Sequence, residues 1–138
     1  MKLILIAALN MLFIFANNAN ANIAVVTNKV NTSEISKEDV TRIYLGKTTT
    51  LDNGNGITPF ILSVDTIDGE YFSKNMLSKS RHQYKAYWST LVFTGKGHPP
   101  AEFEDPTALL NAIRDNENAI GIIPERLVDD TINVVMTF

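Results

Sequence analysis

The stretch "YKAYWSTLVFTGKGHPP", residues 84–100, decides the fold because it carries a helix together with its end. The apolar side chains recur at i, i+3, i+4, i+7 and i+8, which is the stripe of a helix with one buried face: Tyr84, Tyr87, Trp88, Leu91 and Val92. Gly95 is the natural C′ residue for such a helix, and the two prolines at 99 and 100 prevent it from resuming. The stretch therefore predicts a helix that ends at Phe93.

The Gly-Lys-Gly at 95–97 also raises the question of a phosphate-binding loop. Such a loop has the spacing G-x-x-x-x-G-K-[ST] and joins a strand to a helix. Here the glycines follow a helix and the spacing is absent, so the segment is interpreted first as a helix stop. Trp88 has two interpretations, a core residue or a platform for ligand stacking, and its helical spacing favours the core.

Residues 1–21 have the pattern of a secretory signal peptide. Lys2 precedes an apolar run from Leu3 to Ala16, and the segment closes with Ala19-Asn20-Ala21, an A-x-A cleavage pattern. The alternative is a membrane anchor, but the run is shorter than the roughly 20 residues that a span needs, and Asn10 interrupts it. We therefore expect cleavage before Asn22, export, and no membrane span afterwards.

The composition of the remaining chain, residues 22–138, narrows the class of protein. Its length suits one domain with a single core. The formal net charge of the whole chain is −3 and no basic stripe is present, which argues against nucleic-acid binding. The chain has no cysteine, so an exported form has no disulfides and its core carries the fold alone. A Gram-negative periplasm fits these features best.

Apolar runs alternate with helical segments along residues 22–138. The runs at 23–27, 57–64, 119–124 and 132–138 are typical of strands. Helical segments with N-terminal signals separate them, which predicts an α/β domain, with a mainly parallel sheet flanked by helices.

Four N-terminal signals define those helices. Ser36 with Asp39, and Ser80 with Gln83, have the spacing of capping boxes, and Gly46 ends the first helix. Two hydrophobic staples are predicted, one pairing residue 35 with 40 and the other pairing 67 with 72. In the second helix Asp68 is the expected N-cap, and before the last helix an Asp-Pro pair at 105–106 gives the same signal.

A catalytic or metal-binding function lacks support in the sequence. His82 and His98 belong to no nucleophile elbow and no metal spacing such as H-E-x-x-H, so both are expected at the surface. The acidic residues Glu102, Glu104 and Asp105 lack the spacing and the glycine of a calcium loop. We expect a protein that is not an enzyme and needs no cofactor or metal.

Three motifs taken together resemble a known family. "YLGK" at 44–47, "YWSTLVFTGKGHPP" at 87–100 and "AIGIIP" at 119–124, in that order, are similar to the small, single-domain relatives of phosphate ABC-transporter substrate-binding proteins. The resemblance covers residues 24–124. It implies a type II periplasmic-binding-protein fold, export and no catalysis.

The resemblance also implies where a ligand would lie. In the two-domain members, phosphate sits between two lobes, held partly by a Ser-Gly-Thr motif at a helix N-terminus and by an arginine shortly before it. That motif falls on Thr66-Ile67-Asp68 here, and Leu62 stands at the arginine position. The candidate ligand-binding residues, at the mouth formed by strand ends and the helix that starts there, are Thr27, Asn28, Thr66, Asp68 and Lys96.

Two functions follow from this resemblance. The first is a non-catalytic periplasmic solute-binding-like protein for a small anion such as phosphate, with a degenerate anion motif. The second is a module that has lost the ligand and acts as an accessory or sensory partner of an envelope transporter or sensor protein.

Overall fold

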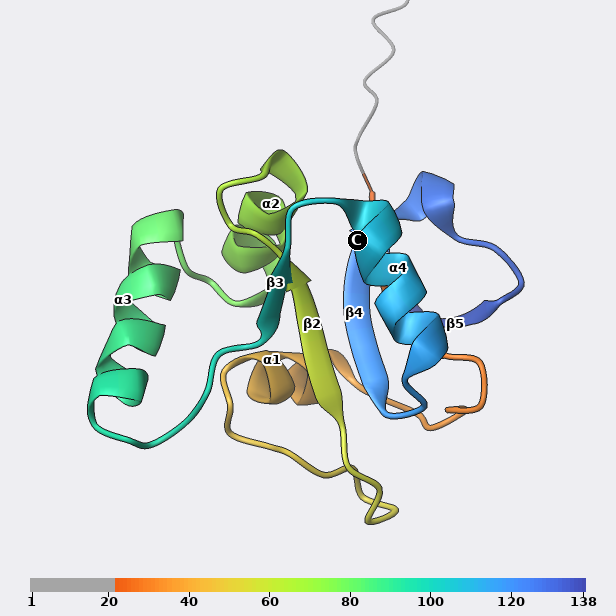
Figure 1. Ribbon diagram of the computed structural model, residues 1–138, viewed down its shortest axis with the longest axis horizontal. Coiled ribbons are helices and arrows are strands. Elements are labelled where there is room, and N and C mark those ends of the chain that lie inside the picture. The colour runs from red at the N-terminus through yellow and green to blue at the C-terminus, as the bar shows by residue number, and fades with distance from the viewer. Residues whose placement is uncertain (1–21) are drawn as a thin grey trace, which may run out of the picture.

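Five strands form one sheet in the order β3-β2-β4-β1-β5 in the computed structural model, which describes residues 22–138 (Figure 1). The predicted signal peptide lies outside the described residues. The strands are β1 (Ile23–Asn28), β2 (Thr58–Leu62), β3 (Ala101–Phe103), β4 (Ala119–Pro124) and β5 (Ile132–Thr137).

Four of these strands share one direction. β2 runs parallel to both β3 and β4, whereas β1 runs antiparallel to both β4 and β5. β1 alone therefore opposes the others. The prediction of an α/β domain with a mainly parallel sheet is confirmed.

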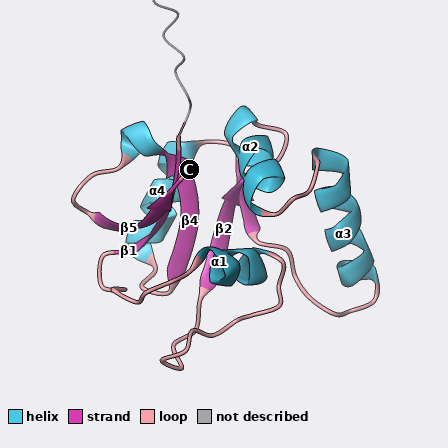
Figure 2. Ribbon diagram, turned by 180° about the vertical axis from the view of Figure 1, so that it is seen from behind, coloured by secondary structure: helices cyan, strands magenta, loops and turns pink. Residues whose placement is uncertain are grey.

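The helices are α1 (Lys37–Tyr44), α2 (Ile67–Met76), α3 (Arg81–Phe93), α4 (Pro106–Asp115) and a short 3₁₀ helix (Glu125–Leu127). α4 covers one face of the sheet, while α1 and α2 cover the opposite face (Figures 1 and 2). α3 stands to the side, beyond β3 (Figure 1). Helices on both faces explain why every residue of β1 and β4 is buried.

The glycine of the "AIGIIP" strand lets α4 approach the sheet closely. A Cβ on Gly121 would lie 2.5 Å from Cδ1 of Ile113 and 2.8 Å from Cδ2 of Leu109. Both side chains are fully buried on the inner face of α4, as their helical spacing predicts. The motif is thus a packing feature of the core.

Most predicted element ends are confirmed. Both capping boxes, at Ser36 and at Ser80, are formed, and Gly46 and Gly95 have φ of 72° and 68° after the ends of α1 and α3. Two strand predictions need correction. The strand expected over 57–64 is shorter, and the three-residue β3 was missed because its sequence, Ala-Glu-Phe, has too little apolar alternation to be seen.

The edge of the sheet at which β2 and β4 end also contains both ends of the described chain. Ile23 and Phe138 exchange two backbone hydrogen bonds of 3.0 Å, and Ile23 pairs with Pro124 at the end of β4. α2 begins at this same edge, directly after β2 (Figure 1). The opposite edge contains the end of β1.

Candidate functional site

The start of α2 is the place where the family resemblance puts an anion. Its N-cap is Thr66, whose hydroxyl accepts a hydrogen bond from the Gly69 N–H at 3.1 Å and donates one to the Ser63 carbonyl at 2.5 Å. Asp68 lies in the first turn, so the prediction that it caps the helix is wrong. The helix starts earlier because Thr66 closes a turn onto Ser63, with its own N–H at 2.8 Å from that carbonyl.

The predicted staple of α2 is also wrong. With Thr66 as the cap, Ile67 becomes the first residue of the helix, and its side chain is 85% exposed. It cannot pack on Phe72, which is fully buried. The first residue of α2 is therefore an exposed isoleucine, whereas the sequence predicted that it would be packed.

Gly69 brings this helix start against the end of β2. A Cβ at this position would lie 2.0 Å from the Ser63 carbonyl oxygen and 2.3 Å from that of Leu62. Because both atoms belong to the backbone, no side-chain rotation could relieve the overlap. The glycine holds α2 in contact with the strand, and this fixes the N-terminal turn in space.

Two basic residues from α3 reach the start of α2. Arg81 donates from Nη2 to Glu70 Oε2 at 2.5 Å and from Nε to the Val64 carbonyl at 3.2 Å. The Lys85 ammonium lies 2.8 Å from one carboxylate oxygen of Asp65. The basic groups beside the start of α2 thus come from α3, whereas the resemblance suggested an arginine at position 62, where β2 ends with a leucine.

The acidic partners of these basic residues are charged at neutral pH. Hydrogen bonding from Lys85 is the largest influence on Asp65, and it lowers the pKa of that carboxyl. Hydrogen bonds from Lys74 and then from Arg81 lower the pKa of Glu70. Each pair favours the ionised carboxylate, so the cluster holds its own negative charges next to the helix N-terminus.

Thr27 and Asn28 lie at the opposite edge of the sheet from Thr66. Thr27 pairs with Ile120 at the beginning of β4, and its buried hydroxyl donates to the Asn31 carbonyl at 3.1 Å. The Asn28 amide donates to the Ile113 carbonyl at 2.9 Å and thereby satisfies a backbone acceptor near the end of α4. The two candidate residues are separated from α2 by the length of the sheet.

The loop around Lys96 serves to enclose Trp88. The exposed Lys96 donates its backbone N–H to the Leu91 carbonyl at 2.8 Å, which closes the end of α3. A Cβ at Gly46 would lie 2.7 Å from Trp88 Cη2, and one at Gly97 would lie 3.4 Å from Cζ3. Gly46 of the first family-like motif and Gly97 of the second therefore make room for Trp88, which belongs to the second motif itself.

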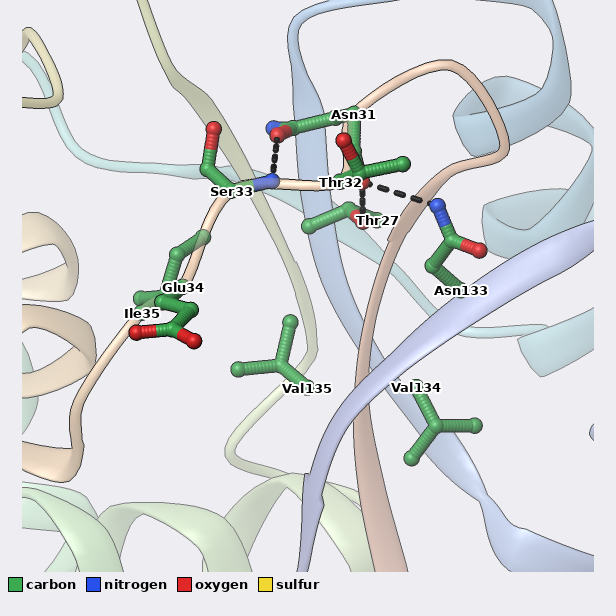
Figure 3. A pocket seen from close by; sticks show the side chains of 9 residues that line it. All are labelled: Thr27, Asn31, Thr32, Ser33, Glu34, Ile35, Asn133, Val134 and Val135. Atoms are coloured by element: carbon green, nitrogen blue, oxygen red, sulfur yellow. Dashed lines mark hydrogen bonds between the residues drawn. The ribbon is translucent and has the colours of Figure 1, made fainter. Parts of the chain in front are cut away.

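A polar cavity of about 400 Å³ lies between the loop after β1 and strand β5 (Figure 3). Its lining residues are Thr27, Asn31, Thr32, Ser33, Glu34, Ile35, Asn133, Val134 and Val135. The Asn133 amide donates to the Asn31 carbonyl at 2.8 Å, and the Asn31 side chain accepts from the Ser33 N–H at 3.1 Å. These groups stabilise the loop itself, and among the described residues that line the cavity none is basic, so it is poorly suited to an anion.

The described residues show no constellation for metal chemistry. Within 22–138 no group of three or more metal-ligating side chains comes together. His82 and His98 are both exposed, as the sequence predicts. In the same range, no helix combines the length and the apolar character needed to span a bilayer.

Comparison with known proteins supports the fold. A phosphate transport receptor of Vibrio cholerae superimposes with a TM-score of 0.63 at 15% identity, over 84% of this chain and 47% of that protein. A phosphate ABC-transporter substrate-binding protein of Clostridium perfringens, solved with bound phosphate, gives 0.55 at 22% identity, over 83% and 45%. No family model and no curated protein matches the sequence. The chain has the fold of such receptors and spans about half of their length.

Proposed function

We propose that this chain is a non-catalytic, exported solute-binding-like protein in which the start of α2 is the position for a small anion of the phosphate type. Support comes from the fold, from the helix N-terminus at Thr66, and from the two cations of α3 beside it. Helix N-termini attract anions because unpaired N–H groups and the helix dipole point outward there. The sequence motif at residues 66–68, which corresponds to the anion motif of the resembling family, supports the choice of this helix.

The observation that carries the proposal further is the contact between Arg81 and Glu70 at 2.5 Å. A phosphate approaching α2 would have to displace this carboxylate, and that of Asp65 from Lys85, to reach the cations. Both carboxylates also repel an anion. We therefore propose that phosphate binds weakly, with a dissociation constant in the millimolar range or above.

A second candidate function is favoured by the same ion pairs. If the internal carboxylates take the ligand's place completely, the chain is a ligand-free accessory or sensory module of an envelope transport or signalling system. The chain then acts through contacts with a protein partner, and phosphate has no effect on it.

Export to the periplasm is part of the proposal. The A-x-A pattern at 19–21 supports cleavage before Asn22. The intact mass of the protein recovered from the periplasm tests this directly, because a mature chain starts at Asn22. A periplasmic protein that retains residues 1–21 would contradict cleavage.

Thermal unfolding with and without phosphate tests the function. A ligand that binds only the native state stabilises it by RT ln(1 + [L]/Kd), roughly 1.4 kcal/mol at a concentration ten times Kd. We expect a rise in the unfolding midpoint at tens of millimolar phosphate that sodium chloride of equal ionic strength does not reproduce. No rise would support the ligand-free module, and a rise at micromolar phosphate would indicate a receptor with an intact site.

A further inference from the structure

Strand β5 forms one edge of the sheet, and its outer side is not paired with another strand. It stands at the end of the order β3-β2-β4-β1-β5 and pairs with β1 alone. Within residues 22–138, no backbone hydrogen bond outside the β1–β5 ladder involves Ile132–Thr137. Because an edge strand directs part of its N–H and C=O groups away from its neighbour, the outer side of β5 presents a row of hydrogen-bonding groups that matches a further strand.

The two edges of the sheet differ in how they are protected. β3 is only three residues long, carries Glu102 and has α3 standing beyond it (Figure 1). β5 spans six residues, Ile-Asn-Val-Val-Met-Thr, with no charged residue, no proline and no glycine. A shift of register opposite Val25 and Val26 adds local twist, but it brings no charge to the strand. Since folded proteins usually block a free edge with charge, proline or brevity, the composition of β5 favours pairing.

Apolar side chains accompany the unpaired edge. Val134 is 47% exposed, and Val135, Met136 and Phe138 are only partly buried against the core. A strand added beside β5 would cover these side chains as well as the backbone groups. Pairing would therefore gain from buried apolar area and cross-strand contacts in addition to hydrogen bonds.

The polar cavity next to β5 selects the kind of strand. It lies between β5 and the loop 31–35, and Figure 3 shows Glu34 on the loop side of it. None of the described residues that line this cavity is basic, and Lys29 is not among them. The Asn133 amide nitrogen already donates to the carbonyls of Lys29 and Asn31, both at 2.8 Å. A carboxylate beside hydroxyl and amide oxygens suits a cationic side chain, which is a donor only.

From these observations we propose that β5 is a docking edge for an extended segment of a protein partner that carries a lysine or an arginine. The segment adds a strand to the sheet through backbone hydrogen bonds, a recurring mode of peptide recognition. Its basic side chain enters the cavity toward Glu34, and its apolar side chains pack on Val134. A second copy of β5 is a poorer occupant, because that strand contains no basic residue. This edge is independent of the proposed anion position at α2.

A synthetic peptide, acetyl-Thr-Val-Lys-Val-Thr-Val-amide, serves as the probe in calorimetric titration of the protein. We expect saturable binding, together with slower hydrogen exchange of the β5 amides when the peptide is present. The same peptide with glutamate in place of lysine should bind roughly twofold to fivefold more weakly, the equivalent of one exposed ion pair. Two further peptides are N-methylated, one on the valines and the other on the remaining residues. At least one of them should fail to bind, because alternate N–H groups of the peptide face β5.

Variants of the protein locate the docking edge. Glu34→Gln should weaken binding of the lysine peptide roughly twofold to fivefold and narrow its advantage over the glutamate peptide. Val134→Lys should also weaken binding, because it places a positive charge on the edge. Val92→Lys on α3, where the side chain is 51% exposed, is the matched control and should bind as wild type does. Circular dichroism checks that each variant is folded.

Four results would overturn the proposal. The lysine peptide does not bind, both N-methylated peptides bind as well as the parent, or Glu34→Gln and Val134→Lys leave its affinity unchanged. The fourth is protection of the β5 amides that increases with protein concentration in the absence of peptide, because a second copy of the chain then occupies the edge.

Discussion

The start of α2 and the buried face of α3 differ in how well their polar groups are satisfied. At α2, Asp65, Glu70, Arg81 and Lys85 all have partners within the chain. At α3, the buried Tyr84 hydroxyl and Trp88 indole N–H have no hydrogen-bond partner within residues 22–138. The charged groups at the start of α2, where the family resemblance suggests a ligand, are thus paired with one another. Two polar groups on α3 are not.

This difference shows why a shared fold does not by itself transfer a ligand. In the two-domain members of the resembling family, phosphate is held partly at a helix N-terminus. Here Glu70 and Asp65 hold the cations that an anion would need. Function on this fold depends on which side chains occupy the site.

The largest expected effect is on the α3 side of the comparison. Trp88 is 4% exposed and lies between Gly46 and Gly97, so Trp88→Ala should destabilise the protein by roughly 3–5 kcal/mol. Urea unfolding followed by circular dichroism measures this. Phe93→Ala on the same helix is the control and should stay within about 0.5 kcal/mol, since that side chain is 92% exposed. Near-wild-type stability of Trp88→Ala would show that the residue is a platform and not core.

The second-largest expected effect concerns the packing of α2 against β2. Gly69→Ala would place a Cβ 2.0 Å from a backbone oxygen, and the helix would have to shift away from β2, at a cost of roughly 3 kcal/mol. Gly56→Ala, where a Cβ would meet nothing within 4 Å, is the matched control for the same unfolding measurement. Equal stability of both variants would contradict the close packing of α2 on the strand.

A smaller effect tests which residue caps α2. Thr66→Ala should cost roughly 0.5–2 kcal/mol, because the Gly69 N–H loses its acceptor. Asp68→Ala should change the free energy of unfolding by a few tenths of a kcal/mol only, since Asp68 interacts with the helix dipole without capping it. A larger loss of unfolding free energy in Asp68→Ala than in Thr66→Ala would show that Asp68 is the cap, as the sequence predicts.

The smallest effect concerns pH. The pKa values of Asp65 and Glu70 are lowered in the folded protein, so their stabilising contribution is complete above their unfolded values of about 3.9 and 4.3. It is lost as the pH falls through the folded values. The difference in unfolding free energy between wild type and Glu70→Gln should therefore be present at pH 6 and decrease steadily as the pH falls below about 4.3. A difference that grows on acidification would contradict the pairing.

Much of the fold could be predicted because its signals are local. The capping boxes at Ser36 and Ser80, the glycines after α1 and α3, and the buried strands all act within a few residues of sequence. The sequence predicted Asp68 as the cap of α2, but Thr66, two residues earlier, is also a residue type that favours this position. Only the turn onto Ser63 decides between them, and that turn depends on where β2 ends.

The candidate site was harder to predict because it is assembled from separate elements. Arg81 belongs to α3 but contacts Glu70 of α2, and spacing along the sequence does not reveal a contact between two helices. One signal was available: Arg81 occupies the first turn of α3, where a basic residue opposes the helix dipole and needs an acidic partner. Thr27 and Asn28 were grouped with Thr66 because the sequence does not reveal the direction of β1 in the sheet.

Calorimetric titration with phosphate tests the central claim, that internal carboxylates occupy the cations of the α2 site. Wild type is expected to bind in the millimolar range or more weakly. Glu70→Gln removes the closer of the two carboxylates beside Arg81 and also releases Lys74, while Asp65 stays 3.6 Å from Arg81. The variant should bind roughly threefold to tenfold more tightly, since charge-assisted hydrogen bonds are worth about 1.5–3 kcal/mol before solvent screening. Asp129→Asn, which breaks the remote pair with Arg114, should match wild type. Micromolar binding by wild type, or unchanged affinity in Glu70→Gln, would contradict the account.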